Sequence, residues 1–128
     1  MSTLLLFNIT DAAKRTAVML LSKRLGFTYR DISPGQQNNS ISDLLAGADA
    51  AAPAASPFSD EMLVMDRFPA EDMHTLLDSM RGAGCPVKLK CVVTETNRSW
   101  SAARLHKALL TEERAMRNIA AGKKKRKK

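Results

Sequence analysis

A group of polar side chains between residues 94 and 100 is the part of the sequence best suited to bind a ligand. Thr94, Thr96, Asn97 and Arg98 follow an apolar, strand-like segment, and Trp100, the only tryptophan, comes next. Hydroxyls and an amide exchange hydrogen bonds, a guanidinium can hold an anion, and an indole can stack on a flat ligand. Because the same residue types are common in turns and helix caps, a purely structural role is the simpler interpretation.

Motifs that would indicate an enzyme are missing from the sequence. It contains no phosphate loop of the form G-x-x-x-x-G-K-[ST], no G-x-G-x-x-G and no G-x-S-x-G. His74 and His106 lie far apart in the chain, and neither belongs to a cluster with the spacing of metal ligands. The sequence therefore predicts no catalytic residue, no metal and no cofactor, and it argues against an enzyme without excluding one.

The positive charge of the chain is concentrated at its end. The formal net charge is +7, from 20 basic and 13 acidic residues. The last six residues are all basic: Lys123, Lys124, Lys125, Arg126, Lys127 and Lys128. Without these six, 14 basic residues stand against 13 acidic ones, so the rest of the chain carries only +1. Such a run is expected to be disordered when unbound, and it can bind the phosphates of RNA or DNA without reading their sequence. A solubilising tail is the alternative.

The sequence predicts a cytoplasmic protein that does not bind a membrane. The apolar run at residues 4–7 is too short for a signal peptide, and no segment approaches the roughly 20 apolar residues of a membrane helix. The two cysteines agree with a reducing compartment. Cys85 and Cys91 lie six residues apart in an apparent strand, or about 20 Å, which is too far for them to form a disulfide with each other.

The spacing of apolar residues predicts four strands that alternate with four helices. In chain order these elements are a strand at 4–9, a helix at 11–25 capped by Thr10, a strand at 27–32, a short helix at 41–46, a strand at 61–65, a helix at 69–82, a strand at 86–93 and a helix at 99–121. We expect a single α/β domain at residues 1–121, with a mobile loop rich in Ala and Pro at about 48–58. Residues 122–128 form the expected basic tail.

This alternation favours a small, mainly parallel four-stranded sheet with helices on both faces and the spatial strand order 2-1-3-4. A ferredoxin-like α+β fold with the order 4-1-3-2 is the alternative. In a parallel sheet the carboxyl ends of the strands meet at one edge, where ligands bind. We therefore expect polar residues that follow three of the strands to share one rim. They are Asn8, Thr10 and Asp11 after the first strand, Asp66 and Arg67 after the third, and Thr94, Thr96, Asn97 and Arg98 after the fourth.

Residues 58–114 resemble a known protein family. The resemblance is carried by Glu61-Met62-Leu63-Val64, by the segment from Pro86 to Val92, by the T-x-T-N-x-x-W pattern of residues 94–100, and by Leu105 in the following helix. The family consists of small bacterial domains of unknown function. The resemblance implies a small cytoplasmic bacterial protein, and it implies no reaction.

Two hypotheses about function follow from these observations. The favoured one is a non-enzymatic binding or regulatory domain whose basic tail associates weakly with nucleic acid. The alternative is a domain, or an enzyme, that binds a small ligand at the carboxyl ends of its strands. The sequence identifies no protein partner.

Overall fold

The computed structural model describes residues 2–47, 57–82 and 87–126, and the side chains of the last helix up to Met116. Four strands, four α-helices and two 3₁₀ helices follow one another along these residues. They are β1 (Thr3–Phe7), α1 (Ala12–Leu25), β2 (Thr28–Ile32), η1 (Pro34–Gln36), α2 (Ile41–Leu45), β3 (Met62–Asp66), α3 (Ala70–Gly82), β4 (Leu89–Val92), η2 (Asn97–Ser99) and α4 (Ala102–Arg126).

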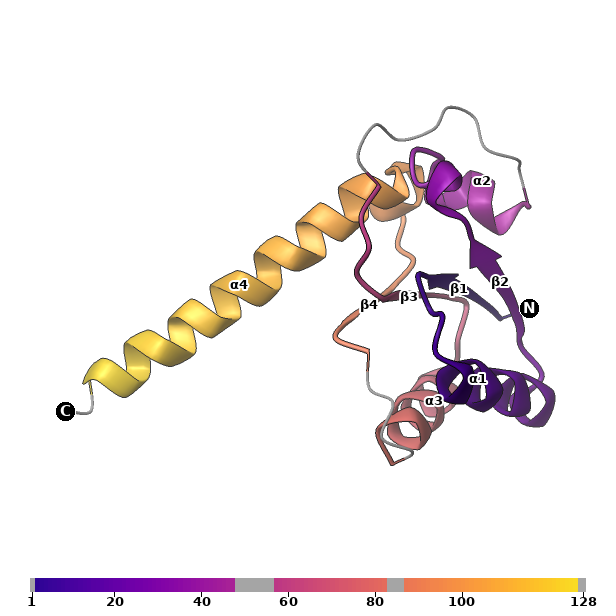
Figure 1. Cartoon of the computed structure of the whole chain (residues 1–128), viewed down its shortest axis with the longest axis horizontal. Helices are drawn as coiled ribbons and strands as arrows, with labels where there is room; N and C mark the ends of the chain where they lie inside the picture. Colours follow the sequence, from indigo (N-terminus) through magenta and orange to yellow (C-terminus); the bar gives the residue numbers. More distant parts are fainter. Residues whose placement is uncertain (1, 48–56, 83–86, 127–128) are drawn as a thin grey trace.

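The fold has three layers, with the sheet between two pairs of helices (Figure 1). Side chains of the central strands β1 and β3 alternate between the two faces. Leu4, Leu6, Leu63 and Met65 pack with residues of α1 and α3. Leu5, Phe7, Met62 and Val64 pack with residues of α2 and α4. Helices on both faces are thus confirmed, and the apolar runs at 4–7 and 62–65 are buried because each of these strands is covered twice.

The sheet has the order β2-β1-β3-β4, which confirms the predicted strand order and excludes the ferredoxin-like alternative. Two of the three strand pairings are parallel, β1 with β2 and β3 with β4. The central pairing of β1 with β3 is antiparallel, with Leu5 opposite Val64, where a parallel pairing was expected. The short α2 helps to explain this difference. At five residues it is about 8 Å long, half the length of a five-residue strand, so it does not return the chain to the edge where β1 begins.

The chain consists of two units with the same order of elements: strand, helix, parallel strand, 3₁₀ helix, helix. The N-terminal unit contains β1, α1, β2, η1 and α2, and the C-terminal unit contains β3, α3, β4, η2 and α4. The antiparallel β1–β3 pair relates the units by an approximate twofold axis between Leu5 and Val64. A second pairing obeys the same symmetry, since Ser40 and Ser101 form an isolated antiparallel bridge directly before α2 and α4. Its two backbone hydrogen bonds, at 2.9 and 3.1 Å, run from Ile41 N to Trp100 O and from Ala102 N to Asn39 O.

Local conformation repeats at matching positions of the two units. The residue after β1, Asn8, and the residue after β3, Arg67, both have a φ of +60°, in the left-handed region. After β2 the side-chain oxygen of Gln36 accepts a hydrogen bond from Ser33 N, at 2.9 Å. After β4 the side-chain oxygen of Asn97 accepts the equivalent bond from Thr94 N, at 2.8 Å. The two strand-to-helix turns are therefore built in the same way, although their sequences differ.

The cap of α1 and both ends of α4 differ from the predicted ones. Asp11, and not Thr10, caps α1, because its carboxylate accepts a hydrogen bond from Lys14 N at 3.0 Å. The last helix begins at Ala102 with Ser101 as its cap, and it continues through Gly122 to Arg126 instead of ending near residue 121. Most of the Ala- and Pro-rich loop expected at 48–58 lies outside the described residues, as do residues 127 and 128 of the basic tail.

Candidate functional site

The turn at residues 94–100, which we call the Thr94 turn, lies at the edge of the sheet where β3 and β4 end. A pocket of about 480 Å³ opens beside it. Its lining comes from the ends of both strands and from the turn: Asp66, Arg67, Phe68, Val92, Val93, Thr94, Glu95 and Arg98. Of the residues expected on one rim, Asp66, Arg67, Thr94 and Arg98 line this pocket. Thr96 is exposed on the turn and is not part of the lining.

Asn97 positions the turn from inside. Its side chain is buried, and its oxygen accepts from Thr94 N while its amide group donates to Val92 O at 3.1 Å. Its backbone N–H donates to the hydroxyl of Thr94 at 3.1 Å. These bonds fix the path of the chain between β4 and η2, so Asn97 has a structural role at the position where the sequence suggested a ligand contact.

Two guanidinium groups lie beside one carboxylate in this pocket. The carboxylate of Asp66 lies 3.9 Å from Arg67 Nε and 4.0 Å from Arg98 Nη2, beyond hydrogen-bonding distance for both. The arginine side chains are 68% and 46% exposed, whereas that of Asp66 is only 13% exposed. The two arginines therefore present positive charge to solvent at the mouth of the pocket.

Asn8 and Thr10 lie at the opposite edge of the sheet, so the single rim expected from a parallel sheet is wrong. The cause is the antiparallel β1–β3 pair, which places the carboxyl end of β1 beside the start of β3. The amide group of Asn8 donates to Phe58 O at 3.0 Å and to Asp60 O at 2.9 Å, and thereby fastens the segment that enters β3.

A smaller pocket of about 270 Å³ occupies this second edge, and Asn8 and Thr10 belong to its lining. An ion pair fills part of it. Both terminal nitrogens of Arg15 bind the carboxylate of Asp31, at 2.6 and 2.7 Å, and Arg15 also donates to Ile9 O at 3.0 Å. The hydrogen bond to Asp31 raises the pKa of Arg15, so the guanidinium keeps its charge at any ordinary pH.

Trp100 belongs to neither pocket. It lies in extended backbone between η2 and α4 and packs against the core that β1 and β3 share with α2 and α4. The guanidinium carbon of Arg104 lies 4.3 Å from the centre of the indole ring, which is a cation–π contact. The tryptophan therefore anchors the start of α4 and holds an arginine at its surface.

A third hollow, of about 500 Å³, was not predicted from the sequence. It lies between α4 and the segment that enters β3, and its lining includes Asp60, Glu61, Lys88 and Glu113. Nearby, His106 Nε2 lies 2.9 Å from Asp60, and the imidazole stacks on the ring of Phe58 with 4.0 Å between ring centres. No sequence motif links positions 46 residues apart, so only the fold brings this histidine to its carboxylate. No group of His, Cys, Asp and Glu in the described part of the chain has the arrangement of a metal site.

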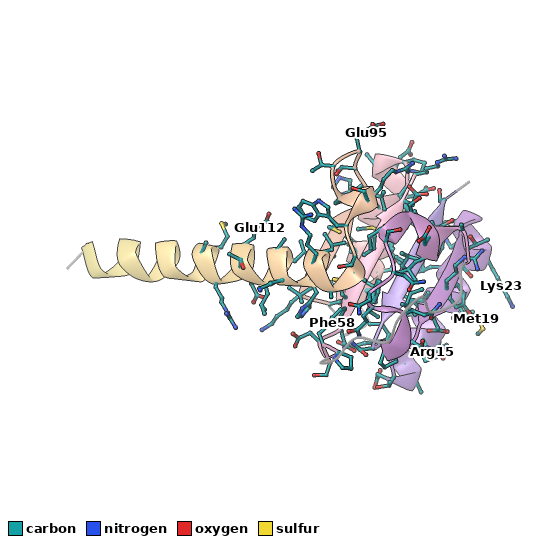
Figure 2. The ribbon with its side chains drawn as sticks, turned by 90° about the horizontal axis from the view of Figure 1, so that it is seen from above. Arg15, Met19, Lys23, Phe58, Glu95 and Glu112 are labelled. Carbon is teal, nitrogen blue, oxygen red and sulfur yellow. The ribbon has the colours of Figure 1, made fainter. Side chains whose placement is uncertain are left out.

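The net positive charge of the chain lies on α4 and the residues that follow it, and not on the three-layer body. Figure 1 shows α4 leaving the three-layer body and projecting into solvent, and Figure 2 shows Glu112 already on the projecting part. Residues 102–128 include ten basic and two acidic residues, whereas residues 1–101 include ten basic and eleven acidic ones. Lys123–Arg126 continue the helix, so at least four of the six terminal cations lie on a regular scaffold.

The thiol of Cys91 is free, and burial raises its pKa to about 11. Cys85 lies outside the described residues.

Within the part of the chain that the structure describes, no helix is both long and apolar enough to cross a membrane.

The C-terminal unit is the part of the chain that a family model recognises. Residues 61–116 match the domain of unknown function DUF3783. The match begins one residue before β3 and ends within α4, so the DUF3783 match covers β3, α3, β4 and η2 together with the pocket at the Thr94 turn. The resemblance noted for residues 58–114 is thereby confirmed as one to a domain of unknown function. Comparisons with curated proteins and with solved structures give no match.

Proposed function

We propose that this protein is a cytoplasmic, non-enzymatic binding or regulatory protein that associates with RNA or DNA through the basic end of α4, residues 123–128. The observation that carries the proposal is the separation of charge. The body at residues 1–101 has a net charge of −1, while the last helix and its end, residues 102–128, have +8. A polyanion would be attracted to the helix and not to the body.

The exposed face of α4 supports the same partner. Ala102 and Leu105 are buried against the sheet, and Leu109 packs beside them. Arg104, Lys107 and Arg114 are exposed, and their spacing of three and seven residues places them together on the opposite face of the helix. These cations extend the basic surface from the end of the helix back to the body.

The length of this surface matches the repeat of a duplex. From Arg104 to Arg126 the helix rises about 33 Å, close to one helical turn of double-stranded DNA. Neutralising about six phosphates gives a slope of roughly −5 when the logarithm of the association constant is plotted against that of the salt concentration. Such binding positions the protein on the nucleic acid and reads no base sequence.

Fluorescence anisotropy of labelled duplex DNA and RNA, measured over a series of salt concentrations, tests the proposal. The pair Lys124→Gln and Lys125→Gln should make the slope less negative by about 2, since each lost phosphate contact contributes about 0.9. A matched control is Lys23→Gln with Arg24→Gln, which removes two charges from the last turn of α1 on the body. Equal effects of both variants, or unchanged binding after removal of residues 123–128, would refute the proposal.

A further inference from the structure

We infer that the pocket at the Thr94 turn binds the carboxylate or phosphate group of a small organic anion. The inference is independent of nucleic-acid binding by α4. It comes from a comparison within the molecule, because the approximate twofold axis relates the two edge pockets to each other. In one pocket, which we call the closed pocket, the hydrogen-bonded ion pair of Arg15 and Asp31 fills part of the space. In the other, the open pocket, no described carboxylate lies within hydrogen-bonding distance of an arginine.

Residues at the strand ends of the two pockets correspond, whereas Arg15 of α1 has no counterpart in the other lining, which contains no residue of α3. Asn8 and Ile9 after β1 match Arg67 and Phe68 after β3. The register of the strands gives the decisive match: Asp31 lies opposite Leu6 in the β1–β2 pair, and Val92 lies opposite Met65 in the β3–β4 pair. The axis also relates Leu6 to Met65, so Val92 stands where the N-terminal unit has Asp31.

The closed pocket shows what this type of concavity accommodates. There a carboxylate from β2 meets a guanidinium in a two-pronged contact at 2.6 and 2.7 Å. The C-terminal unit has Val92 at this position and therefore no carboxylate. The valine side chain is short and apolar, and it is 39% exposed. It does have guanidinium groups, those of Arg67 and Arg98, and the nearest described carboxylate, Asp66, is too distant to bind either directly.

A ligand oxyanion can therefore take the place that Asp31 fills in the other unit. In formal charge Asp66 and Glu95 balance Arg67 and Arg98. The two arginine side chains are nevertheless exposed at the mouth, whereas Asp66 is only 13% exposed, so an anion that enters meets the guanidinium groups first. Planar guanidinium groups bind carboxylate and phosphate oxygens in pairs. Val92 and Phe68 offer apolar surface to the carbon part of the ligand. Figure 2 shows the side chain of Glu95 at the outer end of the turn, and its negative charge opposes the binding of an anion.

Nuclear magnetic resonance titrations of the ¹⁵N-labelled full chain test the inference with benzoate, phenyl phosphate and the neutral analogue benzamide. We expect saturable shifts of the backbone amides of the Thr94 turn at millimolar benzoate or phenyl phosphate, and no such shifts with benzamide. A response to only one anion identifies the group that the pocket prefers. Equal shifts with benzamide, or no saturable shift with either anion, would overturn the inference.

Three variants connect the response to the pocket. Arg98→Gln and Arg67→Asn should each weaken the response at least several-fold, and Glu95→Gln should strengthen it. Asparagine is chosen at position 67 because Asn8 adopts the same positive φ in the other unit, so the backbone tolerates the change. Circular dichroism melting curves verify that each variant folds. An undiminished response in both arginine variants would place the anion elsewhere and refute the assignment.

The closed pocket provides a test by gain of function. Asp31→Val gives the N-terminal unit the residue that the open pocket has and leaves Arg15 without its carboxylate. Benzoate or phenyl phosphate should then shift the amides of Ile9 and Thr10, which should not respond in the wild-type chain. If these amides respond equally with and without Asp31, the ion pair does not close the pocket and the comparison between the units fails.

Discussion

Replacing Asn97 with alanine should destabilise the whole domain, although the residue lies in a turn. The change removes an acceptor from Thr94 N and a donor to Val92 O in a side chain that is only 8% exposed. A typical hydrogen bond contributes about 1 kcal/mol net, and a buried group left without a partner costs more, so we expect a loss of about 2–3 kcal/mol. For a domain of this size that corresponds to a melting temperature lower by roughly 6–12 °C.

Urea unfolding followed by circular dichroism and by the fluorescence of Trp100 measures this loss. The approximate symmetry supplies a matched control, Gln36→Ala, because Gln36 accepts the equivalent bond from Ser33 N but is half-buried and reached by solvent. We expect that variant to lose less than about 1 kcal/mol. A loss below about 0.5 kcal/mol for Asn97→Ala, or equal losses for both variants, would show that Asn97 does not hold the turn as described.

Three further predictions concern other parts of the structure. Gln37→Ala should lower the free energy of unfolding by about 2–3 kcal/mol in urea titrations, because the fully buried Gln37 side chain binds both the N–H and the carbonyl of Phe58; a loss below about 1 kcal/mol would contradict this role. Asp11→Ala should cost about 1 kcal/mol and Thr10→Ala almost nothing, and the reverse order in thermal melts would restore Thr10 as the cap. Burial raises the pKa of Cys91 from 9.0 to about 11, so the folded state keeps the thiol proton to a higher pH than the unfolded state does. The free energy of unfolding should therefore fall by about 2–3 kcal/mol between these pH values. The measurement is made in a Cys85→Ser background, so that Cys91 is the one thiol that titrates. Comparison with the same background carrying Cys91→Ala isolates this contribution, and identical pH profiles would refute it.

The strand order could be predicted because the local signals were strong. Continuous apolar runs at 4–7 and 62–65 identify two central strands, which the orders 2-1-3-4 and 4-1-3-2 both satisfy. The burial expected on both sides of residues 4–7, together with a last helix to cover the second face, favoured 2-1-3-4, the order that the structure has. The direction of β3 relative to β1 could not be predicted in this way, because it depends on the path of the connecting chain and not on the residues within either strand. Because this direction was not predicted, we expected Asn8 and Thr10 beside the Thr94 turn, whereas the structure places them at the opposite edge of the sheet.

The repeat of the two units was also invisible in the sequence. Matching positions share a conformation or a hydrogen-bonding role and not a residue type, as Asn8 and Arg67 show, or Gln36 and Asn97. The predicted end of α4 was wrong for a different reason. Gly122 predicted a helix stop, but one glycine costs a helix only about 1 kcal/mol, and the lysines and arginine that follow are good helix formers. The Thr94 turn itself was found because its pattern is local, whereas the role of Asn97 required the positions of β4 and η2.

The antiparallel β1–β3 pair also has a consequence for how the chain folds. Partners within a unit lie close in sequence, with about 25 residues between Leu4 and Tyr29, whereas Leu5 and Val64 are separated by 59 residues. Closing the longer loop costs more chain entropy, so each strand–helix–strand unit is expected to gain structure before the two units dock. Until docking occurs, each unit exposes one side of its most apolar strand as an unprotected sheet edge. In the folded protein β1 covers the edge of β3, so docking of the N-terminal unit removes an edge that could otherwise pair with β3 of another molecule.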